Sequence, residues 1–483
     1  MNTPLQITWF PGTWRGARGL WPPTLIAAAG LMLAPAVWNG FPFMFYDTAA
    51  FISQAIAGGF FAERSVFYAW FLAATGPSFS LWPAMLAQAL ITALVIAVFL
   101  QRVAPARTDP TIAPRAAVPV IAVLCIGTGL PWYVAQVLPD VFAPLLVLCL
   151  YLLSFHGPSL SRPLQAVFFV IAVLAAAAHA SHLGLAAGLT AVVALLQMVT
   201  RGGAAERVRP DWRWPAAVFA AALLALVVSN FVRTGQVFVS RAGPAFILGR
   251  LVQDGIVKQL LDDTCPESGY RLCEYKDNLP TSADDYLWGA TSPFLPLGGF
   301  EGGAAESRSI IAESLRRYPW IHVRSALVDT VRQFTSFATG DGIEPQQFVL
   351  MPILTQLTPY YLDTYTAARQ QNGLIAFSWL NAIHVPVGYL SLAVLIAMLA
   401  GAVYGRDRGD RLYLPAFVLA ALLGNAFICG ALSNPHDRYQ SRLMWVASLA
   451  AILLVRLPLR QTAGTLANNA DPPTQAPVRP ALS

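Results

Sequence analysis

The sequence predicts an all-α integral membrane protein of about ten transmembrane helices, with an α-rich extracytoplasmic segment inserted after the seventh. Hydrophobic residues make up 56% of the 483 residues and charged residues only 12%, which leaves too little polar surface for a water-soluble protein. Long apolar runs recur along the chain, and one polar stretch, 234–377, interrupts them. The net charge of +6 fits arginines that anchor cytoplasmic loops, so no nucleic-acid partner is expected.

Ten apolar stretches approach the roughly 20 residues that a helix needs to cross a bilayer. The first follows Arg15 and Arg18, but no small-residue cleavage pattern comes after it, so we expect a retained helix and not a signal peptide. The fourth and fifth are short, so the number of helices is defined to about one. The stretches are 24–40, 82–101, 116–135, 141–155, 164–180, 184–200, 215–233, 378–403, 412–431 and 441–457.

The arginines predict the orientation, because they accumulate in cytoplasmic loops. If the N-terminus is cytoplasmic, fifteen arginines fall in the inner segments and three, Arg64, Arg438 and Arg442, in the short outer ones. An even number of helices then returns the C-terminus to the cytoplasm. The chain therefore divides into a seven-helix region (1–233), the extracytoplasmic insertion (234–377), a three-helix region (378–460) and a disordered cytoplasmic tail (461–483).

The insertion contains Cys265 and Cys273, eight residues apart. In an oxidising outer compartment we interpret them as a disulfide, with two free thiols as the alternative. Residues 305–335 alternate apolar and charged side chains at helical spacing around Pro319. They predict amphipathic helices that lie in the membrane interface or pack on the rest of the insertion with a solvated face.

Asp47 is the first candidate site residue, because it follows the first apolar stretch among aromatic residues. A carboxylate so close to hydrocarbon is costly to desolvate and indicates function. The structural alternative is a helix N-cap for the segment that starts at Thr48. Arg64, seventeen residues later, pairs with the adjacent Glu63 or meets an anionic substrate.

Asp140 is a second acidic candidate at the same predicted membrane face. It follows Pro139 and starts the fourth apolar stretch, so an N-cap explains it as well as catalysis does. Two such carboxylates could hold a divalent cation or divide catalytic roles between them. His179 and His182, three residues apart, would share a helix face if the turn between them is helical. They could then bind metal or phosphate, or simply form a polar helix end.

The last outer loop concentrates His436, Asp437, Arg438, Tyr439 and Arg442 between two apolar stretches. Guanidinium groups bind phosphate oxygens in a forked geometry and stabilise a departing phosphate. An interfacial charge anchor is the alternative.

These motifs together resemble the GT-C superfamily of polytopic glycosyltransferases, which includes the protein mannosyltransferases and the aminoarabinose transferase of lipid A. Asp47 in YDTAAF is similar to the acidic residue of the first outer loop in that family, and Asp140 in LPDVF to the one after the third span. The stretch from Arg64 to Gln88 resembles the segment before the second span, without its usual Pro before Tyr, and DRYQSR resembles an element before the final helix. The insertion departs from the family pattern, in which the soluble part is often C-terminal.

The resemblance implies a glycosyltransferase of the bacterial inner (plasma) membrane that uses a polyprenyl-phosphate-linked sugar as donor. Asp47 would deprotonate a lipid or glycan acceptor, with Asp140 as the second catalytic carboxylate and a divalent cation between the two as an optional cofactor. The residues expected to bind substrate are Arg64, His182, His436, Arg438, Tyr439 and Arg442. The alternatives are a secondary transporter and a surface-polysaccharide polymerase or ligase.

Overall fold

The computed structural model describes residues 21–78, 80–103, 112–200, 208–355, 359–405 and 409–456, and these are helical nearly throughout. Seven of its helices are long and apolar enough to cross a membrane. The predicted tail, 461–483, lies outside the described residues, as do Arg15, Arg18 and several other arginines used for the orientation.

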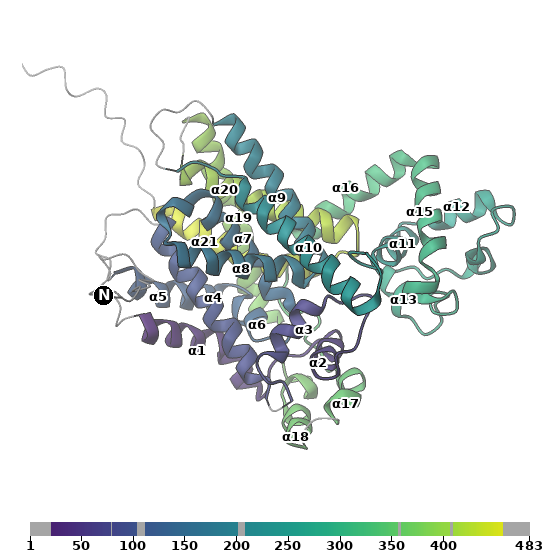
Figure 1. Ribbon diagram of the computed structural model, residues 1–483, viewed down its shortest axis with the longest axis horizontal. Coiled ribbons are helices and arrows are strands. Elements are labelled where there is room, and N and C mark those ends of the chain that lie inside the picture. The colour runs from purple at the N-terminus through teal and green to yellow at the C-terminus, as the bar shows by residue number, and fades with distance from the viewer. Residues whose placement is uncertain are drawn as a thin grey trace, which may run out of the picture.

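A bundle of long helices forms the main body, shown on the left of Figure 1. Every predicted apolar stretch coincides with one of its helices or helix pairs, but α8, α21 and the pair α5–α6 are not among the seven candidate spans. The bundle helices are α1 (Trp21–Asn39), α4 (Trp82–Val103), α5 (Ile112–Gly127), α6 (Leu130–Val134), α7 (Phe142–His156), α8 (Arg162–Ala178), α9 (Ala180–Val199), α10 (Arg213–Thr234), α19 (Ser378–Tyr404), α20 (Asp410–Ala431) and α21 (Asp437–Arg456).

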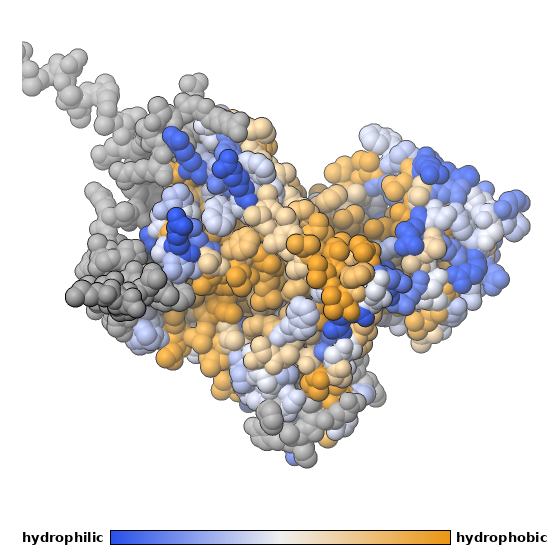
Figure 2. All heavy atoms as spheres, viewed as in Figure 1, coloured by the Kyte–Doolittle hydropathy of each residue, from blue (hydrophilic) through white to orange (hydrophobic). Residues whose placement is uncertain are grey.

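Helix α7 lies at the centre of this bundle. The span that contains it, Pro139–Ser159, is 94% buried, whereas those of α1, α10 and α19 are 28% buried. Its neighbours include α4, α8, α10 and α21. A helix that is apolar on all sides must be surrounded by other helices, whereas the apolar outer faces of α1, α10 and α19 suit lipid. Figure 2 shows this hydrophobic surface over the bundle.

The helix predicted over 116–135 is not continuous, so that prediction was wrong in part. It divides into α5 and α6 at Thr128 and Gly129, and Pro131 begins the new turn. A proline has no N–H for the preceding turn and is favoured at a helix start. After α6 the chain pairs with the first loop, where Phe43 N donates to Ala135 O and Val137 N to Phe43 O at 3.0 and 2.9 Å. A short 3-10 turn, η3 (Pro139–Val141), then leads into α7.

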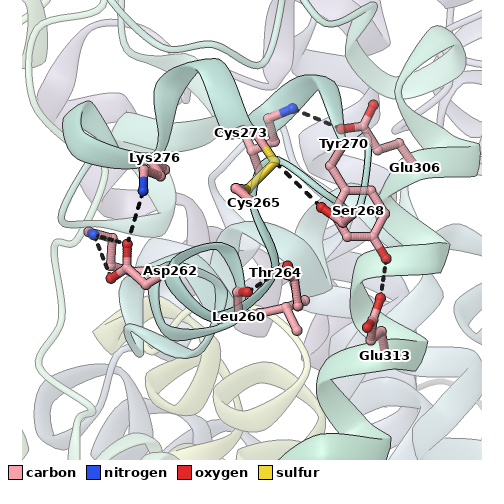
Figure 3. The surroundings of a disulfide bond; sticks show 12 residues. Leu260, Asp262, Thr264, Cys265, Ser268, Tyr270, Cys273, Lys276, Glu306 and Glu313 are labelled. Carbon is pink, nitrogen blue, oxygen red and sulfur yellow. Dashed lines mark hydrogen bonds and ion pairs between the residues drawn. A yellow bond between two sulfur atoms is a disulfide. The ribbon is translucent and has the colours of Figure 1, made fainter.

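The first part of the insertion forms a small lobe, residues 243–317, with its own apolar core (Figure 1, right). Its elements are α11 (Gly243–Gln253), α12 (Ile256–Thr264), η5 (Arg271–Asn278), α13 (Ala283–Trp288), α14 (Gly299–Gly302) and α15 (Ala304–Arg317). A disulfide joins Cys265 and Cys273. Beside it, Tyr270 donates to Glu313 at 2.5 Å, which ties the disulfide loop to α15 (Figure 3).

The second part of the insertion returns to the bundle. Helix α16 (Pro319–Thr335) packs on α20, so the segment predicted as amphipathic consists of two helices, α15 and α16, that meet at Pro319. The chain then forms α17 (Gln347–Leu354), α18 (Pro359–Ala367) and η6 (Gln370–Asn372). Helix α17 packs on the first-loop helix α2 (Thr48–Ala57), which precedes α3 (Val66–Ala73) (Figure 1). The side chain of Gln370 joins this segment to the first outer loop. It accepts a hydrogen bond from Met44 N at 3.0 Å and donates one to Met44 O at 2.7 Å.

Candidate functional site

Asp47 lies at the start of α2, and its partner is an arginine of the same loop. Arg64 forms an ion pair with it, at the turn before α3. Asp47 occupies the N-cap position of α2, but its side chain makes no cap hydrogen bond, so the predicted capping bond is absent. The side chain is 21% exposed, against 11% for Arg64. Asp47 is therefore the carboxylate of the site that a ligand can approach.

Asp140 belongs to a second, more deeply buried ion pair. Arg442 of α21 donates through Nη1 to its Oδ1 at 2.6 Å, and both side chains are at most 5% exposed. Neither η3 nor α7 is capped by this carboxylate, so an N-cap does not explain Asp140 either. Arg442 Nη2 also donates to Ser181 and Asn425, at 3.3 Å each. The guanidinium group thus joins η3, α9, α20 and α21 at one end of the bundle.

Arg438, one turn before Arg442 on α21, links the two ion pairs. Its Nη1 lies 4.0 Å from Asp47 Oδ2. Its guanidinium carbon lies 4.0 Å from the centroid of the Phe45 ring and 4.8 Å from that of Tyr439, while Arg442 lies 5.3 Å from the Tyr439 ring. Aromatic faces attract such cations. Phe45 and Tyr439 therefore hold the two arginines side by side with little solvent around them.

A loop of the insertion completes this arrangement. Asp341 accepts a hydrogen bond from the backbone N–H of Arg438 at 3.0 Å, and Ala338 N donates to Asp437 at 2.9 Å. These bonds fix the first turn of α21, whose N–H groups have no partner within the helix. The insertion consequently reaches the site itself, through residues 338–341.

The site concentrates three arginines. Arg64, Arg438 and Arg442 face Asp47 and Asp140, and Asp341 adds a third carboxylate at the backbone of Arg438. Within the described part of the chain, Nε of Arg64, Nη1 of Arg438 and Nε of Arg442 are buried without a hydrogen-bond partner. Buried donors of this kind are rare unless a ligand or water satisfies them. The arrangement therefore suits an anion with several oxygen atoms.

The two histidines lie beside the Asp140 pair but do not share a helix face. His179 is in extended backbone between α8 and α9 and caps α9 by accepting from Ser181 N at 3.2 Å. The helical turn that a shared face requires is therefore absent, although the centroids of the two rings lie 5.3 Å apart. His182 is fully buried, and its Nδ1 lies 2.9 Å from Ala175 O. Because a carbonyl only accepts, Nδ1 carries the hydrogen, and Nε2 of the neutral ring is left as an acceptor. His182 thus suits a hydroxyl donor better than a phosphate.

His436 faces the lobe, with interactions different from those predicted. Its Nε2 lies 3.1 Å from Asp284 of α13 and its Nδ1 3.6 Å from Asp341. Burial opposes the charged form, but the hydrogen bonds to Asp284 and Asp341 outweigh burial and raise the pKa of His436 to about 9. We therefore assign His436 to the contact between the lobe and the last outer loop.

The charges also bear on the expected divalent cation. Guanidinium groups already neutralise Asp47 and Asp140, so neither carboxylate offers an unpaired negative charge to a metal ion. The described residues contain no group of three or more His, Cys, Asp or Glu side chains placed to hold a metal. This donor set does not fit a divalent cation, and we derive no step through one.

Three residues of the site were missed in the sequence. Asn425 was detectable as an amide within an apolar helix, where polar side chains have a partner or a function. Ser181 and Asp341 gave no such signal, because serines and loop aspartates are common.

Comparisons with protein-family models, with curated proteins and with solved structures found no match to this chain.

Proposed function

We propose that this protein is a membrane glycosyltransferase that moves a sugar from a polyprenyl phosphate to an acceptor at the outer face of the bilayer. The observation that supports it best is the buried cluster of Arg64, Arg438 and Arg442 around Asp47 and Asp140 at one end of an apolar bundle. A lipid phosphate carries its charge at the end of a bilayer-embedded chain, and a cluster at the end of an apolar bundle suits such a charge.

In the proposed reaction, Asp47 takes the proton of the acceptor hydroxyl. The hydroxyl oxygen forms a bond to the anomeric carbon of the sugar, and the bond between that carbon and the phosphate oxygen breaks. The electron pair leaves with the phosphate, whose growing negative charge is met by Arg438 and Arg442. These arginines are positioned before the reaction by Phe45, Tyr439 and Asp140, so little reorganisation is needed.

The carboxylates of the two ion pairs have different roles in this proposal. Asp140 is nearly inaccessible and holds Arg442 in place, so we assign it a positioning role instead of the catalytic role expected from the sequence. Asp47 is the more exposed carboxylate and takes the proton. Arg64 orients Asp47, and its free Nε contributes to the anion site. His182 Nε2 accepts a hydrogen bond from a hydroxyl of the sugar.

The test compares lipid and surface-glycan masses of cells that carry the native gene, a deletion, Asp47→Asn or Asp277→Asn. Asp277 is a control carboxylate on the lobe, 74% exposed. We expect Asp47→Asn to reproduce the mass change of the deletion at native expression level, and Asp277→Asn to match the native protein. If the deletion changes no glycan mass, or if Asp47→Asn leaves every mass native, the proposal is wrong.

A further inference from the structure

Helix α16 exposes apolar side chains and buries polar ones, the reverse of a helix on the surface of a water-soluble protein. Its exposed side chains include Trp320, Leu327 and Val331, at 80%, 64% and 64% exposure, and Val323 and Val328 at 45% and 56%. These positions follow helical spacing and form one apolar stripe. The buried residues of α16 are polar: Asp329, Thr330 and Gln333. Hydrophobic residues gather over this part of the surface in Figure 2.

The polar face is held inward by specific bonds, so the stripe cannot turn toward the protein. Arg250 of α11 forms ion pairs with Asp254 and Asp329 and donates to Gly430 O of α20 at 3.1 Å. One turn later, Gln333 exchanges hydrogen bonds with the backbone of His436, at 2.8 and 2.9 Å. These contacts fix the rotation of α16 about its own axis.

Helices α15 and α16 also carry basic side chains here. Arg324 lies within the stripe, one turn from Trp320 and from Leu327. Arg332 of α16 and Arg316 at the end of α15 lie outside it, and all three arginines are exposed. A helix with an apolar face, a tryptophan and flanking arginines suits the boundary between lipid chains and head groups. At about 1.5 Å per residue its 17 residues reach about 25 Å, short of the roughly 30 Å hydrocarbon core.

We propose that α16 lies in the membrane interface, with the stripe Trp320, Val323, Leu327, Val328 and Val331 in contact with lipid chains and its arginines on lipid phosphates. Part of the insertion is then immersed in the bilayer surface. Because α16 joins the lobe to α20, this contact sets the height of the lobe above the membrane. The partner is phospholipid of the leaflet on the side of the lobe. The proposal stands independently of the transferase activity.

The test places a fluorescent probe on this stripe in the full chain, reconstituted in vesicles of phosphatidylethanolamine and phosphatidylglycerol. Leu327→Cys is labelled in a background in which Cys125, Cys149 and Cys429 are alanine. Val331→Cys is the second position, and Asp277→Cys on the lobe is the exposed control. Quenching is measured with spin-labelled lipid carrying the nitroxide near the head group, and with iodide in the water.

We expect spin-labelled lipid to quench the probes at 327 and 331 at least twice as strongly as the probe at 277, and iodide to show the reverse order. Equal iodide quenching at 327 and 277 would mean that the stripe faces water. Protection from both quenchers would mean that protein covers it. Either result overturns the proposal, and gel filtration verifies that each labelled protein is folded.

Discussion

At the scale of single residues, burying the charged pair Asp140–Arg442 costs free energy of desolvation, and this cost indicates the role of the pair. Both groups are almost fully removed from solvent, and the attraction between buried charges repays their desolvation only when the remaining donors are also bonded. Ser181 and Asn425 accept hydrogen bonds from Nη2 of Arg442, but Nε of Arg442 has no partner among the described residues. A pair left partly unsatisfied in this way is more readily explained by a ligand than by stability.

Removing one member of this pair should strongly destabilise the protein. We expect Asp140→Asn to lower the free energy of unfolding by about 3–5 kcal/mol, because Arg442 is left as an unpaired buried charge. The double variant Asp140→Asn with Arg442→Gln should lose less than the sum of the single changes. Denaturant unfolding in detergent measures both, with Arg317→Gln on the exposed face of α15 as the control. Strict additivity would show that the two side chains do not interact.

His436 should make the attachment of the lobe depend on pH. Its pKa is raised to about 9, so the stabilisation is fully present below about pH 6.5, the value in the unfolded chain, and is lost as the pH rises through 9. The pKa values of Asp284 and Asp341 are lowered despite partial burial, Asp284 chiefly by its hydrogen bond to His436, so both stay ionised across that window.

The thermal midpoint should therefore fall between pH 7 and pH 10, and His436→Gln should flatten that profile. The matched control is His322→Gln, because His322 lies on α16 with Ser314 as its hydrogen-bond partner and a pKa lowered by burial. A native-like pH profile in His436→Gln would show that the Asp284–His436–Asp341 contact does not hold the lobe.

At the scale of elements, the loop 338–346 must approach the first outer loop closely. Gly342 has a φ of +79°, and a Cβ at this position would overlap the ring of Phe45, which supports Arg438. We expect Gly342→Ala to lower the free energy of unfolding by about 1–3 kcal/mol more than Gly373→Ala does, as overpacking does. Gly373 also has a positive φ, +64°, but a Cβ there meets open space. Equal losses in the two variants would show that Phe45 moves aside freely.

Hydropathy predicts where helices lie because it reports which segments leave water. The ten stretches coincide with helices or helix pairs for that reason, and the seven that meet the criteria of length and apolarity are the most secure. Hydropathy does not report continuity, so the interruption at Thr128 and Gly129 was missed, although Pro131 marks it. Hydropathy also does not show which segments pack against one another. The division of the insertion into a lobe and a segment that returns to the bundle could therefore not be predicted.

The candidate site was predictable only in outline. Carboxylates and arginines next to apolar stretches stand out, and Asp47, Asp140, Arg64, Arg438 and Arg442 do lie together. Which arginine meets which carboxylate depends on helix packing, and the sequence contains no such information. The contacts of His436 could not be predicted for the same reason, because its carboxylate partners come from segments more than 90 residues away.

At the scale of the whole molecule, the described ion pairs of the bundle lie at two opposite ends. At the start of α21 and α7 lies the arginine–carboxylate cluster. At the start of α20 and the end of α7, Asp410 accepts from Tyr151 and contacts His156, at 2.6 and 2.9 Å. Because α7 runs between these ends and is buried along its length, it fixes their separation. The cluster therefore lies at one boundary of the apolar bundle and not in its middle, where transporters commonly place their binding sites.

The proposed function requires this cluster to bind the phosphate of a membrane lipid, and the affinity for polyprenyl phosphate tests that requirement. Titration of the full chain in nanodiscs should give a Kd that rises about tenfold to a hundredfold in Arg438→Gln, because a charged hydrogen bond contributes about 1.5–3 kcal/mol. Arg271→Gln, which removes the same charge from the lobe, should bind as the native protein does. Native affinity in a folded Arg438→Gln variant would contradict the claim.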